Sequence, residues 1–306
     1  MRVLAPRRFP GPAWDELRDV EYLEWPLTAE RPGAEALAVV ARRVDATVLD
    51  LLPDLRLVAN YGAGYELVDL DACRARGIMV TNTPGAVDAP TADLAFALIL
   101  AVRRRIVEGD RYVRAGGWGT GWAEEELMGD DVSGATLGIV GLGGVGRAVA
   151  RRARAFDMRV LYAKRRRLAR GDDERLGVEH RELDALLGEA DIVTLHVPHT
   201  GETERLIHAR RLALLQDGAC LVNTARGAIV DEDALVRELV SRRIRAGLDV
   251  FVHEPQVPEQ LFGLPNVVLA PHLGTALASA REAMTRVVVD NLLAFERGER
   301  PPNVVA

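Results

Sequence analysis

Short apolar runs alternate along the chain with segments of helical or turn character. Five such runs come first, at residues 3–5, 20–23, 47–49, 57–59 and 78–80. A second series has longer helical segments between its members, at residues 137–140, 160–162, 192–195, 221–222, 248–250 and 267–269. Apolar runs of this length, separated by helical patterns, are typical of parallel strands. The pattern therefore predicts an α/β protein with two doubly wound parallel sheets.

Two longer segments are apolar at helical spacing. Residues 91–113 carry apolar side chains through Leu94, Leu98 and Val102, and residues 275–296 follow a similar pattern. Because the second helix runs back after the last strand, we expect the tail, residues 299–306, to rejoin the first domain. The predicted domains are 1–98 together with 275–306, which is discontinuous, and 99–274, with a ligand cleft between them.

The composition is that of a globular chain. Its 306 residues are 48% hydrophobic and 27% charged, which gives each of two domains enough material for a core. The longest apolar stretch, residues 94–102, is far shorter than the about 20 residues that a membrane span requires. The chain begins with a strand pattern and shows no signal-peptide segment. We therefore expect a cytoplasmic protein.

The cysteine count and the net charge argue against several other classes of protein. Cys73 and Cys220 are too few for a disulfide framework or a metal cluster, and their apolar surroundings predict buried thiols. No His, Cys and carboxylate cluster has ligand spacing, so no metal site is predicted. The net charge of −6 and the pI near 5.6 argue against a nucleic-acid surface.

A glycine-rich turn gives the clearest indication of function. The strand-like run at residues 136–140 leads into Gly141-Leu142-Gly143-Gly144-Val145-Gly146, and a helical pattern follows. In a dinucleotide site the first glycine tightens the turn, the second lets the backbone approach a pyrophosphate, and the third lets the helix close on its strand. The unpaired N–H groups at the helix start then face the phosphates. The sequence therefore predicts a dinucleotide cofactor at Gly141, Gly143, Gly144, Val145 and Gly146.

The next strand end indicates which dinucleotide is bound. NAD sites place an acidic residue about 20 positions after the glycines. Here Lys164, Arg165, Arg166 and Arg167 follow the strand at 159–162, and no carboxylate is available. A guanidinium there would pair with a 2′-phosphate, which NAD lacks. We predict NADP(H) as cofactor, bound by Lys164, Arg165 and Arg166, with NAD(H) as the alternative.

Solvation is the other explanation for these basic residues. We interpret the preceding positions, Arg147, Arg151 and Arg154, as an exposed helix face.

Three polar residues follow predicted strands of the second series: Arg226 in Asn223-Thr224-Ala225-Arg226-Gly227, Glu254 before Pro255, and His272 after Pro271. Ligand sites of α/β proteins assemble at the carboxyl ends of parallel strands. Taken singly, each has a simpler explanation, because Arg226 could cap a helix, Glu254 could lie in an exposed turn, and His272 could be an ordinary loop residue.

Together these motifs resemble the D-isomer-specific 2-hydroxyacid dehydrogenases, in which they occur in the same order. The resemblance runs from about Asn60 to the end of the second long helix. It includes the glycine turn, residues 223–227, the strand at 247–250 with Glu254 and Pro255, and Pro271-His272. Within the family the chain is most similar to the glyoxylate/hydroxypyruvate reductases, whose NADPH-using members also lack an acid where Lys164 stands. The resemblance implies a flavodoxin-like substrate domain and a Rossmann domain.

Reduction of a 2-keto acid assigns a role to each of these groups. Arg226 can clamp the substrate carboxylate and polarise the carbonyl, while the N–H groups of Ala63 and Gly64 can form an anion nest. His272 would deliver the proton as hydride arrives from the nicotinamide, and would act as the base in the reverse reaction. Glu254 would hold the ring and favour its imidazolium form.

The resemblance implies further contacts. Asp249 matches a family residue at the nicotinamide end, and His196 is expected near the cofactor without chemistry. Trp118 resembles a tryptophan that some reductases insert into the neighbouring subunit's active site, which would favour small substrates and predicts a homodimer; its alternative is a core or loop-packing aromatic. The predicted cofactor contacts outside the glycine turn and basic run are Val197, Pro198, Thr203, Thr224, Asp249 and Gly274.

Other functions remain open at this point. The same scaffold could act on D-lactate-like acids, on 3-phosphoglycerate or on phosphite, because fold does not fix the substrate. The lack of a further domain after residue 306 counts against the longer phosphoglycerate enzymes. From another class, a dinucleotide-sensing corepressor could keep the glycine turn and even the three polar residues. We favour the enzyme.

Overall fold

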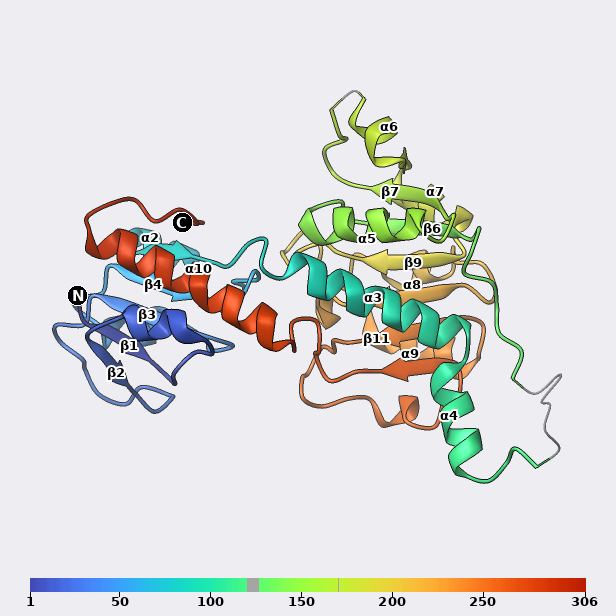
Figure 1. Ribbon diagram of the computed structural model, residues 1–306, viewed down its shortest axis with the longest axis horizontal. Helices are drawn as coiled ribbons and strands as arrows, with labels where there is room; N and C mark the ends of the chain where they lie inside the picture. The colour runs from blue at the N-terminus through green and yellow to red at the C-terminus, as the bar shows by residue number, and fades with distance from the viewer. Residues whose placement is uncertain (120–126, 170) are drawn as a thin grey trace. The chain divides into compact units, whose positions relative to one another are not determined.

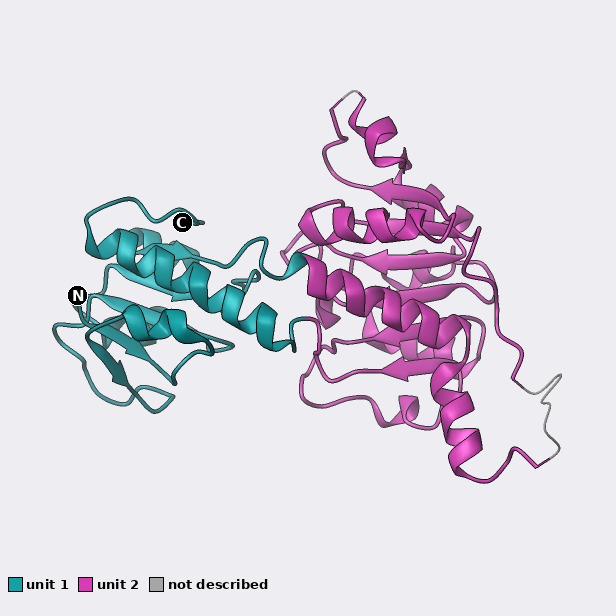
Figure 2. Ribbon diagram, in the orientation of Figure 1, with its two compact units in different colours: residues 1–88, 275–306 teal, residues 89–274 magenta. Residues whose placement is uncertain are grey.

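The computed structural model describes residues 1–119, 127–169 and 171–306, which form two compact units (Figure 2). Unit 1 contains residues 1–88 and 275–306, and unit 2 contains residues 89–274. The chain thus leaves unit 1 earlier than the predicted position after residue 98. The reason is that the helix starting at Asp88 packs its apolar residues Leu98, Ile99 and Val102 into the core of unit 2.

Unit 1 is built on a five-stranded parallel sheet in the order β2-β1-β3-β4-β5 (Figure 1). This order is that of the flavodoxin-like fold, as expected. Its strands are β1 (Val3–Ala5), β2 (Val20–Tyr22), β3 (Ala36–Val39), β4 (Leu57–Asn60) and β5 (Met79–Thr81).

One predicted strand of unit 1 is wrong. Residues 47–49 lie in helix α1 (Ala46–Asp50), whose first turn is capped by the Asp45 carboxylate accepting from the Val48 N–H at 3.3 Å. The strand that completes the sheet is β3, and all four of its residues are buried. Its sequence, Ala-Leu-Ala-Val, is a weak strand signal because alanine is common in helices.

Helices of unit 1 cover both faces of the sheet and enclose two apolar cores. They are α1, α2 (Leu70–Ala75), α10 (Ala278–Glu296) and the 3-10 helix η1 (Pro12–Glu16). The long helix α10, red in Figure 1, buries Met284, Val288 and Leu292 against β-strand residues of one core. The tail then bonds to β5, where Thr81 bridges Val304 in antiparallel fashion.

Unit 2 carries a seven-stranded parallel sheet in the order β12-β11-β10-β9-β6-β7-β8. The order reverses between β6 and β9, which is the topology of a Rossmann sheet. Its strands are β6 (Thr136–Val140), β7 (Arg159–Ala163), β8 (Glu179–His180), β9 (Ile192–Leu195), β10 (Cys220–Asn223), β11 (Arg245–Leu248) and β12 (Val267–Leu269). The strand predicted at 248–250 begins three residues earlier and ends at Leu248. The Asp249 carboxylate that follows it accepts the N–H groups of Leu273 and Gly274.

Two helices replace the single one predicted at residues 91–113. Helix α3 (Asp88–Arg103) ends before Arg105, which takes a left-handed conformation with φ of 51°, and α4 (Ile106–Arg114) follows. Figure 1 shows α4 bending away from α3, and it has no buried residue. The other helices of unit 2 are α5 (Gly144–Arg154), α6 (Asp172–Leu176), α7 (Leu183–Glu189), α8 (Ala209–Leu212), α9 (Glu232–Val240), η2 (Gly227–Ile229) and η3 (Glu259–Leu261).

Both cysteines are buried, as predicted, and burial raises the pKa of Cys73 to about 11 and that of Cys220 to about 12. Within the described ranges, no helix combines the length and the apolar character needed to cross a bilayer.

Candidate functional site

The carboxyl ends of six strands line up at one edge of the sheet in unit 2. Val140 pairs with both Ala163 and Leu195, and Asn223 pairs with both Leu195 and Leu248. Leu248 in turn pairs with Leu269. The segments that continue past these ends carry most of the predicted site residues: Gly141, Lys164, His196, Thr224, Arg226, Asp249 and His272.

The glycine turn has the shape that a pyrophosphate requires. Gly141 has φ of 96°, and a Cβ there would lie 2.6 Å from the carbonyl oxygen of His196. A Cβ on Gly146 would lie 2.2 Å from the carbonyl oxygen of Gly141. Both positions therefore exclude a side chain. Beside Gly143, by contrast, no atom of the described residues lies within 4 Å of the Cβ position, and α5 begins directly after it. The inner side of the turn is closed, and the side toward the helix N-terminus is open.

A buried hydroxyl without a partner also fits a bound cofactor. Thr224 follows β10 and is 7% exposed, and its Oγ1 has no hydrogen-bond partner in the described part of the chain. Buried hydroxyl groups are normally satisfied, so this one is available to a ligand. Thr203, in contrast, uses its hydroxyl to close its own loop, donating to the carbonyl of Pro198 at 2.6 Å and accepting from the Thr200 N–H at 2.8 Å. Val197 borders the glycine turn, since its Cγ1 would meet a Cβ on Gly141 at 2.7 Å.

The basic run lies at the end of β7, and its members differ in their partners. Lys164 follows the strand directly, next to the glycine turn, whose Gly141 N–H donates to Ala163 O at 2.9 Å. Arg165 pairs with Glu202 at 2.5 Å, with both side chains largely exposed. Arg167 pairs with Asp173 at 3.2 Å. Lys164 and Arg166 are exposed and make no ion pair within the described ranges.

An acid–base pair lies at the other end of the site. His272 Nδ1 is 2.8 Å from Glu254 Oε2, and Glu254 Oε1 accepts the N–H of Phe251 at 3.1 Å. The backbone N–H of His272 donates to the carbonyl of Asp249 at 2.9 Å, and His272 has a left-handed φ of 55°. Because the carboxylate holds Nδ1, Nε2 is the nitrogen that remains for proton transfer.

Asp249 anchors the segment that carries this histidine. Its carboxylate is fully buried and accepts the N–H groups of Leu273 at 2.6 Å and Gly274 at 3.0 Å. Burial raises the pKa of this carboxyl, and the two N–H donors oppose the rise. The Thr91 hydroxyl lies 3.4 Å from the Gly274 carbonyl. Asp249 and Gly274, both predicted as cofactor contacts, are thus bonded to each other.

The segment around Arg226 is fixed by a residue that sequence reasoning did not single out. Asn223, the last residue of β10, donates from Nδ2 to the Arg226 carbonyl at 2.9 Å and accepts the Ala225 N–H at 3.0 Å. A Cβ on Gly227 would lie 2.0 Å from the Phe251 carbonyl carbon, so the turn admits only glycine there. The signal was present, because an Asn at a strand end before a glycine is a common turn former.

The remaining predicted residues lie elsewhere. Ala63 and Gly64 belong to a turn in unit 1 that follows β4. Trp118 follows α4 and is 58% exposed, which does not match a core aromatic. The rest of its loop, residues 120–126, lies outside the described residues. No group of three or more His, Cys, Asp or Glu side chains that could hold a metal ion occurs among the residues described.

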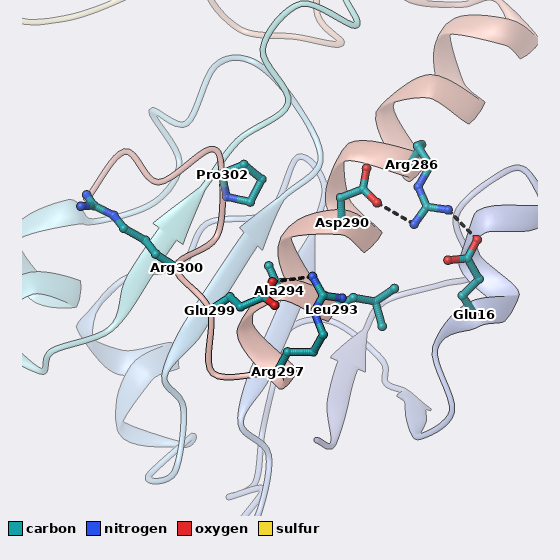
Figure 3. A pocket seen from close by; sticks show the side chains of 9 residues that line it. All are labelled: Glu16, Arg286, Asp290, Leu293, Ala294, Arg297, Glu299, Arg300 and Pro302. Carbon is teal, nitrogen blue, oxygen red and sulfur yellow. Dashed lines mark hydrogen bonds and ion pairs between the residues drawn. The ribbon is translucent and has the colours of Figure 1, made fainter.

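A hollow on unit 1 is not related to this chemistry. It has a volume of about 780 Å³ and lies in unit 1 (Figure 3). Its charged side chains neutralise one another, with Arg286 between Glu16 at 2.5 Å and Asp290 at 2.8 Å and Arg297 bonded to Glu299 at 2.6 Å. None of the predicted site residues lines this hollow. Because its charges balance, it offers no net charge to a ligand.

Known proteins place the chain in a family. Residues 96–274 match the model of the D-isomer specific 2-hydroxyacid dehydrogenase, NAD binding domain. Glyoxylate reductase from Thermococcus litoralis is 47% identical over 273 residues, covering 88% of this chain and 82% of the relative. That from Pyrococcus furiosus is 46% identical over 297 residues, covering 95% and 88%.

Solved structures agree with this assignment. The NADPH-dependent glyoxylate/hydroxypyruvate reductase from Sinorhizobium meliloti, in complex with NADP and malonate, has a TM-score of 0.90 at 35% identity, covering 100% of this chain and 96% of that one. D-lactate dehydrogenase from Aquifex aeolicus, complexed with NAD and lactic acid, has a TM-score of 0.88 at 28% identity, covering 100% and 99%.

A Rossmann sheet with a glycine turn and a carboxylate-held histidine at its strand ends is the arrangement expected of a nicotinamide-dependent dehydrogenase. The chain belongs to the D-isomer specific 2-hydroxyacid dehydrogenase family. The predicted family and fold class are therefore confirmed, and the protein is an enzyme with a nicotinamide dinucleotide cofactor.

Proposed function

We propose that this enzyme reduces a small 2-keto acid of the glyoxylate or hydroxypyruvate type to the D-2-hydroxy acid, with NADPH as reductant. The observation that carries the proposal is the His272–Glu254 pair at 2.8 Å, at the same sheet edge as the glycine turn. The names of its relatives, glyoxylate reductases at 46–47% identity, support the substrate class.

The residues act in a simple order. When bound, the cofactor supplies a hydride to the carbonyl carbon of the substrate. Arg226 and the N–H groups of Ala63 and Gly64 bind the carboxylate of the keto acid. His272 gives the proton on Nε2 to the carbonyl oxygen as negative charge develops there, so one hydride and one proton complete the alcohol. Glu254 holds Nδ1 and stabilises the charged ring before the transfer.

Cofactor binding is assigned to the residues around the glycine turn. The N–H groups at the start of α5 would hold the pyrophosphate, and the Thr224 hydroxyl would bond to the ligand. Lys164, Arg165 and Arg166 would bind the 2′-phosphate of NADPH, because no carboxylate follows β7 directly to bind ribose hydroxyls. Val197, Pro198, Thr203 and Gly274 are proposed to line the rest of this site.

A panel of 2-keto acids tests the proposal, with absorbance of the reduced nicotinamide followed for both NADPH and NADH. We expect the highest kcat/KM for glyoxylate or hydroxypyruvate with NADPH. A higher value for pyruvate would point to D-lactate chemistry. Oxidation of phosphite or of 3-phosphoglycerate, measured in the reverse direction, would identify that compound as the substrate instead. Negligible reduction of every keto acid, with dinucleotide and peptide binding retained, would favour a corepressor-like protein.

A homodimer and a cytoplasmic location remain predictions. Helix α4 and the segment after it expose the large apolar side chains of Ile106, Val113 and Trp118. Exposed apolar side chains of this size are common where a second protein chain binds. We propose that a second copy of the chain covers it and that Trp118 reaches the partner's substrate, which restricts that site to small acids.

A further inference from the structure

Two asparagines lie side by side behind the predicted anion nest in unit 1. Asn60 ends β4 and Asn82 follows β5, two neighbouring strands whose register pairs Ala59 with Thr81. The next residues beyond this pair are Asn60 and Asn82, at the carboxyl edge of the sheet. The turn at residues 61–65 begins at the same edge.

The side-chain amides of these asparagines donate to the carbonyl groups of the turn. Asn60 Nδ2 donates to the carbonyl oxygens of Gly62 at 3.0 Å and Gly64 at 2.8 Å. Asn82 Nδ2 donates to the carbonyl oxygen of Ala63 at 2.8 Å. Two side chains therefore bond to three successive carbonyl groups, of which that of Gly62 also accepts the Thr83 N–H at 3.0 Å.

Fixing these carbonyls also orients the N–H groups of the nest. A trans peptide is planar, and its N–H points opposite to its C=O. The peptide with the Gly62 carbonyl carries the N–H of Ala63, and the peptide with the Ala63 carbonyl carries the N–H of Gly64. Each N–H must therefore point away from the asparagine amides. The hydrogen bonds of the described residues leave both N–H groups without an acceptor.

Burial separates Asn60 from the ligand, whereas Asn82 is half-buried. Asn60 is only 7% exposed, and its amide is enclosed by the turn, since a Cβ on Gly62 would lie 3.4 Å from Asn60 Nδ2. The turn is also anchored from its other side, where the Tyr61 hydroxyl donates to the Arg281 carbonyl at 2.7 Å. A buried amide that bonds two carbonyls of one turn acts on the shape of that turn.

We propose that Asn60 and Asn82 are positioning residues for substrate: they hold the turn so that its N–H groups converge on the carboxylate of the keto acid. This inference rests on the proposed function, in which Ala63 and Gly64 bind that carboxylate. Asparagine suits the task because its amide carries two N–H donors and no charge, and Asn60 uses both. Donors oriented before binding lose less entropy when the anion arrives.

The test compares Asn60→Ala and Asn82→Ala with the parent enzyme. Asn60→Ala releases the Gly64 carbonyl and Asn82→Ala releases the Ala63 carbonyl, whereas the Gly62 carbonyl keeps its bond from the Thr83 N–H at 3.0 Å. We therefore expect KM for glyoxylate to rise about tenfold in each variant, the effect of one net hydrogen bond. The inhibition constant of oxamate, a carboxylate that carries no hydride acceptor, should rise by a similar factor. The dissociation constant of NADPH should stay within about twofold, because the cofactor residues lie in unit 2.

Asn291→Ala is the matched control. Asn291 is fully buried in the same unit and also holds backbone, donating to the Val287 carbonyl at 2.9 Å and accepting the Asn303 N–H at 3.1 Å. We expect this variant to lose stability without a change in KM for glyoxylate. An equal rise in Asn291→Ala would show a general structural effect and overturn the proposal, as would an unchanged KM in Asn60→Ala.

A conservative variant keeps the test informative if Asn60→Ala does not fold. Asn60→Ser retains one donor and should show an intermediate KM, whereas Asn60→Asp places carboxylate oxygens against two carbonyls and should raise KM most. A serine variant no better than the aspartate variant would contradict the proposal. Failure of the proposed function looks different, because the parent enzyme itself would then not reduce 2-keto acids.

Discussion

At the scale of single residues, the chemistry depends on how His272 is held. The sequence identifies the histidine and Glu254 through the motifs around them. It does not show that the buried Asp249 carboxylate binds the two N–H groups that follow the histidine, because that contact depends on the path of a loop. Asn60 and Asn82 escaped prediction for the same reason, since their partners are backbone atoms of a turn.

Replacing His272 with alanine removes the proposed proton donor. We expect kcat to fall by about 10²–10⁴-fold, the usual range for loss of a general acid, with little change in NADPH affinity. Steady-state kinetics and NADPH fluorescence titration measure the two effects. His253→Ala, at an exposed neighbouring histidine, is the control and should leave kcat unchanged. Turnover retained in His272→Ala would reject the assignment.

Replacing Lys164 and Arg165 together by alanine tests the cofactor preference. The Arg165–Glu202 pair is exposed, so exchanging Glu202 for a phosphate costs little. We expect kcat/KM for NADPH to fall roughly tenfold or more, as for loss of charge-assisted bonds, while the value for NADH stays nearly constant. Arg151→Ala, on the exposed face of α5, should change neither. A parent enzyme that prefers NADH would rule out the preference.

At the scale of elements, the sequence predicted strands where apolar runs are flanked by turns, and it failed where helix and strand signals compete. The run at 47–49 contains β-branched residues, but the Asp45 cap starts a helix there. The break between α3 and α4 was missed because Arg105 takes a left-handed conformation, which the sequence usually indicates by a glycine or an asparagine and not by an arginine. That break is decided by packing, since α3 follows the core only as far as Val102.

The end of β9 gives a prediction about pH. His196 is mostly buried, its Nε2 lies 2.9 Å from Thr194 Oγ1, and burial lowers its pKa to about 3. The unfolded chain, with a histidine pKa of about 6.5, therefore binds a proton below that pH which the folded chain does not. The free energy of unfolding should fall as pH drops from 6.5 toward 3.

Urea unfolding at pH 7 and pH 5 measures this effect. Between these values the parent should lose at most about 2 kcal/mol more than His196→Asn, which cannot take up the proton. The comparison removes the contributions of carboxylates, which are the same in both proteins. An equal loss of unfolding free energy in the two proteins would show that the folded protein does not hold His196 in its neutral form.

At the scale of the whole molecule, the alternation of strands and helices predicts two parallel sheets, but not which strands are neighbours. The order follows from topology. In unit 2, β6 lies between β7 and β9, so the order in which strands are added to the sheet reverses at β6, whose end carries the glycine turn. In unit 1, β4 lies next to β5, which brings two asparagines far apart in sequence to one turn. In both units most of the predicted ligand groups are found where the strands end; Trp118, which follows α4, is an exception.

The exposed face of α4 allows a prediction about assembly. We expect the protein to scatter light as a dimer of about twice 33.4 kDa at micromolar concentration, because Ile106, Val113 and Trp118 would otherwise remain in water. Val113→Glu places a charge on this face and should give a monomer. Val240→Glu, at a similarly exposed valine on α9, should remain a dimer. If Trp118 completes the partner's site, the Val113→Glu monomer should also have a higher KM for glyoxylate than the parent. A parent protein that is itself monomeric would contradict the proposed interface.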